Sequence, residues 1–367
     1  MRDGPPREGV STVEPTVRPR TGRGLAIDVH SHYVPRGWPD LAAEVGTCRD
    51  WPSLRIDSEK EAMILVGSKE FRAIGSNSWD AETRLADMDA DGVDVQVVSP
   101  TPVFFGYDLP GREAVKVSRI FNDLGLEVCA PAADRLLPFA QVPLQDPDAA
   151  CVEADRCMAN GHVGVEIGNH VGDRDLDDEG IVTFLQHCAE NSIPVFVHPW
   201  DMASSPRLDR WMARWTTGMP AETHLSIVAM ILGGVFDRIP DTLKICFAHG
   251  GGSFAFWLGR LENAWFGRGD VIATSEQPPS HYVGRFSVDS VVFDPIALRT
   301  LVDTLGPTQV MVGSDYPYPL GERPVGAVVH KADYLTDEVR SALLGGNAAR
   351  FLGLDVGETA RRAKMGS

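Results

Sequence analysis

The amino-acid sequence predicts an α/β protein built as a (β/α)8 TIM barrel. Eight short apolar or β-branched runs alternate with eight longer amphipathic stretches along most of the chain. Strands that alternate with helices form βαβ units and a parallel sheet. Eight such units over about 250 residues or more favour a closed barrel. A doubly wound open sheet is the alternative arrangement of the same pattern.

The expected strands are the short runs Leu25–Val29, Val93–Val98, Leu136–Val142, Val163–Ile167, Pro194–Val197, Lys244–Ala248, Phe286–Val292 and Val310–Gly313. The expected helices span residues 81–91, 114–129, 147–159, 178–191, 221–237, 253–265, 295–305 and 336–346. The third helix opens with Asp146-Pro147, an N-cap followed by proline at the first helical position. Thr336 is a similar start signal for the last helix.

One domain, residues 25–354, accounts for most of the chain. Residues 1–24 are rich in Pro, Arg, Gly and Thr, and residues 355–367 are mostly small and charged, so we expect both ends to be disordered tails. The segment 33–80, between the first strand and its helix, is long and lacks a regular pattern. Long loops in compact domains are usually functional, so we expect a lid or a substrate-binding insertion there.

Charge and composition exclude several classes of protein. The 34 basic and 51 acidic residues give a net charge of −17, which argues against non-specific binding to nucleic acid or to an anionic membrane. An anionic substrate would therefore need a local cationic clamp. The apolar runs are too short to span a bilayer, and residues 1–24 show no apolar core of a secretory signal. The six Cys form no CxxC pair, so we expect a reduced, cytoplasmic protein.

Histidines and an aspartate stand at the ends of four expected strands. His30 and His32 end the first strand, and residues two apart on a strand point the same way, so the pair can share one metal ion. His198, His249 and Asp315 follow three later strands. The carboxyl ends of barrel strands meet at one mouth, where active sites lie. Imidazoles with a carboxylate suit Zn²⁺, with Fe²⁺, Mn²⁺ or Co²⁺ as alternatives.

Each of these features also has an ordinary structural explanation. A strand-end histidine is often only hydrogen-bonded, the glycine run 250–252 can be a tight turn, and Asp315 can be a turn residue. Together, that explanation needs four coincidences at four strand ends. The constellation therefore favours a metal site.

Longer strings of the sequence resemble one family. They are Phe71-Arg72, Trp79-Asp80, Met88–Gln96, Gln141–Gln145, Ile167–His170, His198–Met202, Met219–Thr223, Ala248–Gly252, Gly313–Pro317 and Pro319–Glu322. With them, roughly residues 25–354 resemble the α-amino-β-carboxymuconate-ε-semialdehyde decarboxylase family of the amidohydrolase superfamily. The resemblance implies an amidohydrolase-type barrel with an insertion, residues 33–80, after the first strand. It also implies non-oxidative decarboxylation of 2-amino-3-carboxymuconate 6-semialdehyde to 2-aminomuconate 6-semialdehyde and CO₂, a reaction of tryptophan catabolism.

The resemblance also implies roles for the strand-end residues. His30, His32, His198 and Asp315 would hold one Zn²⁺ per chain, with a water in the remaining position. A zinc ion with an open position lowers the pKa of its water to about 7. His249 would lie beside that water as general base, a role suited to imidazole. Its alternatives are a histidine that is only hydrogen-bonded in the glycine turn and a further metal ligand. Asp315 belongs to the catalytic set as well.

Two arginines match the carboxylate clamp of the family. Arg72 lies in the insertion, and Arg260 matches an arginine that reaches across a homodimer interface into the neighbouring site. Guanidinium groups bind carboxylates bidentately, which suits a small anionic carboxylate substrate. By the same resemblance, Trp200, Trp215 and Tyr318 would line the pocket, although aromatic residues near a barrel mouth are usually part of the core.

Two residues depart from the family pattern. Glu166 on the fourth strand replaces a neutral amide, so a second metal ion is conceivable there, and Tyr318 replaces an apolar ring. Either change would suit a related acid as substrate. Alternatives are therefore decarboxylation of another aromatic or muconate acid, metal-dependent hydrolysis of a lactone or amide, and a catalytically silent barrel that only binds.

Overall fold

The computed structural model describes residues 24–46, 50–269 and 273–355. Its parallel strands are β1 (Ile27–Tyr33), β5 (Val95–Pro100), β6 (Leu136–Pro138), β7 (Ala140–Gln141), β8 (Val165–Gly168), β11 (Val195–His198), β12 (Ile245–Phe247), β13 (Ser287–Asp289) and β14 (Val310–Met311). They form two sheets, β1-β5-β6 and β14-β13-β12-β11-β8-β7. The expected tails lie outside the described residues, apart from Gly24 and Asp355.

The two parallel sheets are bridged at both ends. One residue, Phe139, separates β6 from β7. At the other end, the backbone N–H of Val29 donates to the carbonyl of Val312 (2.9 Å), and that of His32 donates to the carbonyl of Tyr316 (2.7 Å). The strand order is thus that of the expected barrel, but the strands as paired form two sheets and no closed ring.

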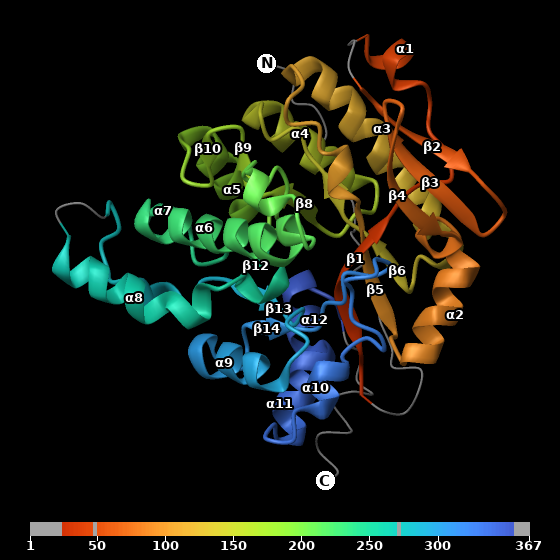
Figure 1. Ribbon diagram of the computed structural model, residues 1–367. Coiled ribbons are helices and arrows are strands. Elements are labelled where there is room, and N and C mark those ends of the chain that lie inside the picture. The colour runs from red at the N-terminus through yellow and green to blue at the C-terminus, as the bar shows by residue number, and fades with distance from the viewer. Residues whose placement is uncertain (1–23, 47–49, 270–272, 356–367) are drawn as a thin grey trace, which may run out of the picture.

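Helices follow the strands and cover the outside of the sheets (Figure 1). They are α2 (Ala81–Asp91), α3 (Gly111–Cys129), α4 (Pro147–Ala159), α5 (Glu179–Glu190), α6 (Met219–Leu232), α7 (Val235–Arg238), α8 (Phe254–Gly267), α9 (Pro295–Leu305), α10 (Ala327–Lys331), α11 (Asp337–Ser341) and α12 (Asn347–Leu352). The bounds expected for α2, α4 and α9 are confirmed. Asp80, Asp146 and Asp294 cap these three helices through backbone N–H groups.

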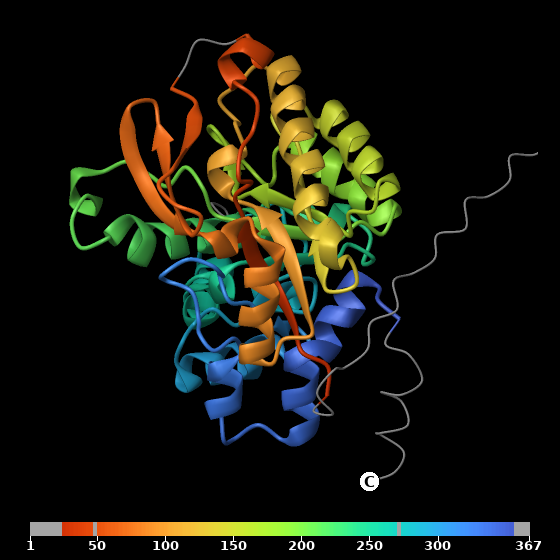
Figure 2. The same ribbon diagram turned by 90° about the vertical axis from the view of Figure 1, so that its right-hand side faces the viewer.

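The expectation of an irregular segment over residues 33–80 was wrong. The segment contains α1 (Leu41–Val45), the antiparallel sheet β2 (Pro52–Ile56), β3 (Glu61–Val66) and β4 (Lys69–Gly75), and a short 3-10 turn. Polar residues on the outer face hid the alternation: Ala62 and Ile64 are buried, whereas Glu61 is exposed. Gly67 (φ 59°) forms the tight turn between β3 and β4. Figure 2 shows this small sheet (orange) standing apart from the parallel strands.

The apolar core closes one end of the parallel strands. Side chains from the strands, among them Ile27 and Phe196, pack in one buried cluster with Phe351 and Leu352 of α12. A second large cluster lies between the strands and the outer helices. A third joins the small sheet to α3, with Ile64 beside Phe121. The polar residues at the carboxyl ends of the strands do not belong to this apolar cluster.

The described residues contain no helix long and apolar enough to cross a membrane. Five of the six cysteines are free thiols, and Cys48 lies outside the described residues.

Candidate metal centre and substrate pocket

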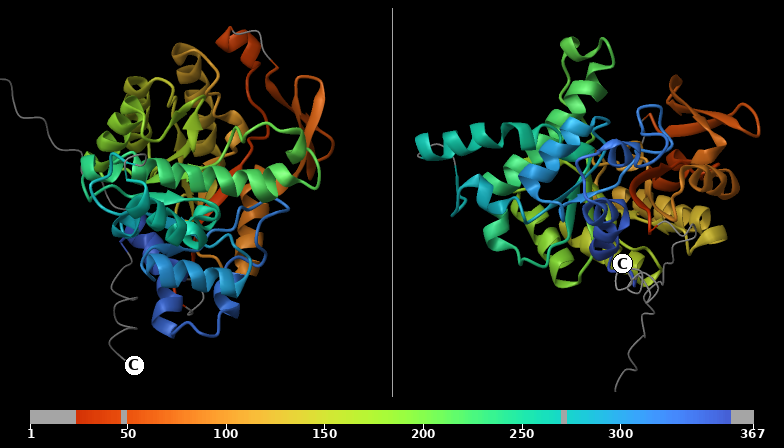
Figure 3. Two further views of the ribbon diagram at one scale, coloured as in Figure 1. Left: turned by 60° about the vertical axis from the view of Figure 1, so that its left-hand side comes forward. Right: turned by 90° about the horizontal axis from the view of Figure 1, so that it is seen from below.

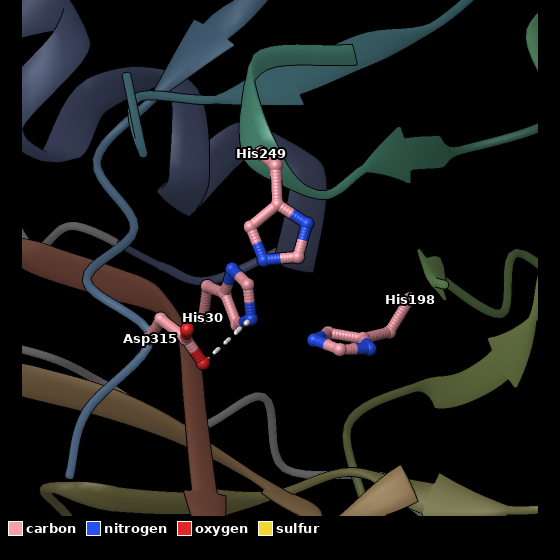
Figure 4. Close-up of side chains that lie close together, drawn as sticks. All are labelled: His30, His198, His249 and Asp315. Atoms are coloured by element: carbon pink, nitrogen blue, oxygen red, sulfur yellow. Dashed lines mark ion pairs between the residues drawn. The ribbon is translucent and has the colours of Figure 1, made fainter. Parts of the chain in front are cut away.

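Four of the predicted residues converge at the carboxyl ends of the strands. Candidate ligand atoms of His30, His198, His249 and Asp315 all lie within 4.8 Å of one another (Figure 4). They come from β1, from β11, from the turn after β12 and from the segment after β14. Residues more than 280 positions apart in sequence thus meet at one point.

His32 belongs to the same cluster. Its Nε2 lies 3.1 Å from Nε2 of His30 and 3.3 Å from Oδ1 of Asp315. The four residues that share one metal-ligand geometry include His249 and not His32, which contacts two of them. The structure therefore places His249 at short range, where the sequence leaves two roles open for it, beside the metal or bound to it.

The second ring nitrogens show that this donor set fits a cation. In His30, His32 and His198, Nδ1 faces an oxygen that can only accept a hydrogen bond. These oxygens belong to Asp289 (2.6 Å), to the carbonyl of Pro100 (3.4 Å) and to the carbonyl of Pro199 (3.0 Å). Nδ1 therefore carries the proton in a neutral ring, and Nε2 carries a lone pair. Two such lone pairs only 3.1 Å apart repel, and a cation between them satisfies both.

The pKa values of His32, His198 and Asp315 suit metal binding at neutral pH, whereas the hydrogen bond and charge of Asp289 raise the pKa of His30 despite its burial. Burial lowers the pKa of His32 to about 4 and that of His198 well below its usual value. Burial alone would raise the pKa of Asp315, but its contacts with the imidazoles of His32 and His30 lower it to about 2. Neutral imidazoles and an ionised carboxylate are the states in which these side chains bind a metal.

Asp289, at the end of β13, is a functional residue that the sequence analysis missed. Its fully buried carboxylate accepts hydrogen bonds from Nδ1 of His30 and from the backbone N–H groups of His249, Gly250 and Val291. One side chain thus holds both an imidazole of the cluster and the turn that carries His249. The sequence placed it inside the seventh expected strand, Phe286–Val292, so it gave no strand-end signal, whereas the structure ends β13 at Asp289.

The glycine run after His249 makes the turn possible. His249 itself has a φ of 55°, and Gly250, Gly251 and Gly252 all have positive φ values. A Cβ atom at Gly252 would collide with the carbonyl oxygen of Pro220. His249 Nδ1 is buried and has no hydrogen-bond partner among the described residues. This nitrogen is therefore available to move a proton.

Glu166 on β8 has both carboxyl oxygens buried and without a hydrogen-bond partner in the described part of the chain. Its Oε1 lies 3.8 Å from Nδ1 of His32. Burial raises the pKa of Glu166 well above its usual value, so the carboxyl group is held neutral in this arrangement. Glu166 is not among the four residues that share the common metal-ligand geometry.

Arg72 and Tyr318 form a stack beside the cluster. The Arg72 guanidinium lies 4.4 Å from the centre of the Tyr318 ring, and that ring lies 5.5 Å from the His32 ring. The Tyr318 hydroxyl pairs with Thr101 Oγ1 at 2.5 Å. The small sheet thereby places the Arg72 guanidinium against the Tyr318 ring, which in turn lies against the ring of His32, a candidate metal ligand.

The two predicted tryptophans lie farther out. Trp200 follows β11, packs partly buried against the core and meets Phe71 of β4 edge-on at 6.5 Å. Trp215 lies in a π-helical turn (Arg214–Gly218), and its buried Nε1 has no partner among the described residues. The structure records no contact of Trp215 with the imidazole cluster.

Arg260 lies outside the cluster of its own chain. It is exposed on α8 and lines a separate cavity of about 360 Å³ with His224, Ser253 and Trp257. Figure 3 shows α8 along the outside of the molecule. Within one chain, the structure therefore brings Arg72, but not Arg260, to the site.

Comparison with known proteins agrees with this arrangement. A model of the amidohydrolase family matches residues 27–354. A 2-amino-3-carboxymuconate-6-semialdehyde decarboxylase of Dictyostelium discoideum is 39% identical over 335 residues, which cover 91% of this chain and 93% of the relative. The chain belongs to this decarboxylase family of amidohydrolases.

Solved structures of other decarboxylases extend the family comparison to the fold. A 5-carboxyvanillate decarboxylase of Sphingomonas paucimobilis is 26% identical with a TM-score of 0.74, covering 90% of this chain and 99% of that one. One from Novosphingobium aromaticivorans, solved with manganese and 4-hydroxy-3-methoxy-5-nitrobenzoic acid, is 21% identical with a TM-score of 0.73, covering 94% and 100%. The predicted family is confirmed, and membership in it implies the TIM-barrel fold.

Proposed function

We propose that this protein is a metal-dependent decarboxylase that converts 2-amino-3-carboxymuconate 6-semialdehyde to 2-aminomuconate 6-semialdehyde and CO₂, a step of tryptophan catabolism. The cluster of His30, His198, His249 and Asp315, with His32 in contact with two of its members, carries the proposal, together with membership in a family of that activity. The reaction is redox-neutral: the bond to the carboxylate carbon breaks, CO₂ leaves, and a proton takes its place on the substrate carbon. No oxidant or organic cofactor is needed.

We assign the metal-binding role to His30, His32, His198 and Asp315, and propose Zn²⁺ as the ion, one per chain. Three nitrogen donors and one carboxylate suit zinc, although a family relative of similar fold was solved with manganese. When bound, the ion supplies Lewis-acid stabilisation of negative charge as CO₂ departs.

His249 is the proposed proton carrier. Its buried Nδ1 has no partner in the described residues, and the Asp289 carboxylate fixes its backbone. Burial lowers the pKa of His249 below its usual value, with a further contribution from His30. The imidazole is therefore neutral at neutral pH and ready to accept a proton before returning it to the substrate carbon.

Arg72 is the proposed carboxylate-binding residue of the same chain. Arg72 stacks on Tyr318 and forms no ion pair with another described residue, so its guanidinium can bind an anion bidentately, and Phe71, its neighbour on β4, contacts Trp200. We propose that residues 33–80 act as a substrate-binding insertion in a single catalytic domain, residues 25–354, and that Trp200, Trp215 and Tyr318 wall the pocket.

We further propose a homodimer in which Arg260 completes the site of the partner. Phe256 and Phe266 of α8 are 73% and 69% exposed, and Trp257 is also exposed. Such a cluster of exposed rings on one helix is typical of a protein–protein interface. Arg260 stands on this helix and does not reach the cluster of its own chain.

Another aromatic or muconate acid is the second candidate substrate. Glu166 and Tyr318 support it, because a neutral carboxyl group and a phenol near the cluster can each hydrogen-bond a substituent of the substrate. Solved structures of similar fold include decarboxylases of 5-carboxyvanillate. The paired arginines suit a dianion better than the neutral substrate of a lactonase or amidase.

The deciding experiment measures CO₂ release from freshly generated 2-amino-3-carboxymuconate 6-semialdehyde, with zinc-loaded and chelator-treated protein side by side. Zinc-dependent release supports the proposal. No release from protein that holds zinc contradicts this substrate, and a panel containing 5-carboxyvanillate and dihydroxybenzoates then tests the second candidate.

A further inference from the structure

A fully buried arginine lies behind the candidate metal ligands. Arg84 of α2 is 1% exposed, and its recorded hydrogen bonds reach the hydroxyl of Ser31 (3.2 Å), Oε1 of Gln96 (2.8 Å) and the carbonyl of His32. None of these acceptors is a carboxylate. A buried charge is costly unless hydrogen bonds and an opposite charge compensate it.

Gln96 connects this arginine to a buried carboxylate. Its Oε1 accepts from Arg84, and its Nε2 donates to Oδ2 of Asp28 at 2.8 Å. Asp28 is fully buried and also accepts from the backbone N–H of His30 (3.1 Å) and from the hydroxyl of Ser314 (2.6 Å). The Gln96 side-chain amide thus connects the Arg84 guanidinium to the Asp28 carboxylate, which share no direct hydrogen bond among the described contacts.

Arg84 and Asp28, the two residues that Gln96 connects, each hydrogen-bond a segment of the chain that carries metal-binding residues. Arg84 binds the carbonyl of His32, and Asp28 binds His30 on one side and Ser314, next to Asp315, on the other. Around Asp315 the chain has a φ of 59°, a left-handed conformation that costs energy in a residue other than glycine. Such a turn needs outside contacts to stay in place.

We propose that Asp28 and Arg84 are positioning residues that set the spacing between the two histidines of β1 and Asp315, and thereby the affinity and geometry of the bound metal. The inference rests on the metal assignment proposed above. Arg84 fixes the carbonyl of β1, while the Asp28–Ser314 hydrogen bond ties β1 to the turn that presents the carboxylate.

Direct titration with Co²⁺ tests this role, because the ion reports both affinity and ligand geometry through its visible spectrum. The variants are Asp28→Asn, which keeps the shape and removes the charge, and Ser314→Ala, which removes the hydroxyl that donates to Asp28 and accepts from the backbone N–H of Tyr316. Arg84→Lys is a third variant that keeps the charge but not the fork of donors. Loss of a partner behind a metal ligand typically weakens metal binding about 10- to 100-fold.

Glu153→Gln is the matched control. Glu153 is also a buried carboxylate, with hydrogen bonds from Asn122 and Arg156, but it lies on α4 and touches no metal-binding segment. We expect this control to lower the thermal midpoint without changing the Co²⁺ dissociation constant or spectrum. Asp28→Asn and Ser314→Ala are expected to change both.

Wild-type-like Co²⁺ affinity and spectrum in Asp28→Asn and Ser314→Ala would overturn the positioning role of Asp28, and the same result in Arg84→Lys would overturn that of Arg84. Absence of Co²⁺ binding by the wild type would overturn both roles, along with the metal assignment. If the wild type binds Co²⁺ but releases no CO₂ from any acid tested, only the proposed reaction fails, and the variants still decide the positioning role.

Discussion

The carboxylate of Asp289 lies 2.6 Å from Nδ1 of His30 and determines which nitrogen of that ring faces the cluster. A carboxylate on Nδ1 fixes the tautomer and makes Nε2 a stronger donor to a metal. The same carboxylate accepts the backbone N–H of His249. A single side chain thus couples a metal-binding ring to the proposed proton carrier.

Asp289→Asn should weaken zinc binding about 10- to 100-fold, because the amide no longer favours the Nδ1–H tautomer of His30. Zinc affinity is measured by competition with a chelator. Asp303→Asn is the control, since Asp303 is exposed and its ion-pair partner among the described residues is the exposed Arg299. Equal zinc affinity in wild type and Asp289→Asn would show that the carboxylate does not orient His30.

His32→Asn and His249→Asn separate a metal ligand from a proton carrier. We expect His32→Asn to lose zinc, and His249→Asn to keep it while kcat falls about 10²- to 10⁴-fold, the usual contribution of general acid–base catalysis. Metal content by elemental analysis and single-turnover rates check the pair. Loss of zinc from His249→Asn would instead make His249 a ligand, as its place in the cluster also allows.

Arg72→Lys should raise KM and lower kcat/KM about 10- to 100-fold, because an ammonium cannot replace a bidentate guanidinium. Zinc content should not change. Arg55→Lys is the matched control: it lies on the same small sheet, and its partners are the exposed Asp57 and Glu70. Equal losses in both variants would mean that the sheet is perturbed and that Arg72 binds no carboxylate.

Mixing Arg72→Ala chains with Arg260→Ala chains tests the dimer. If Arg260 acts in the partner's site, each mixed dimer has one site with both arginines, and about half the wild-type activity per dimer returns. Each variant alone should be nearly inactive with normal zinc content. Mixed dimers without activity would place both arginines in one chain's site or remove Arg260 from the mechanism.

Glu166→Gln should change the pH dependence of stability in the metal-free protein. The folded-state pKa of Glu166 is raised above its value of 4.5 in the unfolded chain, so the folded state holds the proton longer. The free energy of unfolding therefore falls as pH rises above about 4.5, until the folded carboxyl ionises. We expect the urea midpoint of wild type to decline between about pH 5 and 8 more than that of Glu166→Gln.

Glu190→Gln is the control for that comparison, because Glu190 is exposed and its side-chain hydrogen bond in the described part of the chain is with Gln186. Parallel pH profiles for wild type and Glu166→Gln would show that Glu166 ionises normally in the folded chain.

Periodicity and strand-end residues predicted much of this molecule. The bounds of α2, α4 and α9 follow from caps and apolar spacing, which are local signals. The small sheet β2–β4 escaped because half of each strand faces solvent, so Glu61 and Lys69 obscured the alternation of Ala62 and Ile64. The short strands also interrupt the pairing that a closed barrel requires.

In the candidate site, too, residues with a local sequence signal were predicted, whereas residues whose role depends on distant contacts were not. His30, His32, His198 and Asp315 are recognisable because each follows an apolar run and because the strings around them resemble one family. Asp289 is equally buried, but its role depends on a contact with His30, 259 residues away. Arg84 and Asp28 were missed for the same reason: their partners are fixed by the fold, and no local pattern distinguishes them from other buried polar residues.

The packing of α12 against β1 has a consequence for synthesis of the chain. Leu25 and Ile27 share a buried cluster with Ala348 and Phe351, and Gly345 approaches the backbone of Leu25 too closely to allow any side chain. The first strand to leave the ribosome thus lacks its apolar cover until the helix near the other end of the chain has been translated. During that interval the apolar side chains of β1 remain uncovered, and the strand can aggregate with other unfolded chains. Nascent chains stalled before residue 347 should therefore depend on chaperones more than chains stalled beyond residue 354.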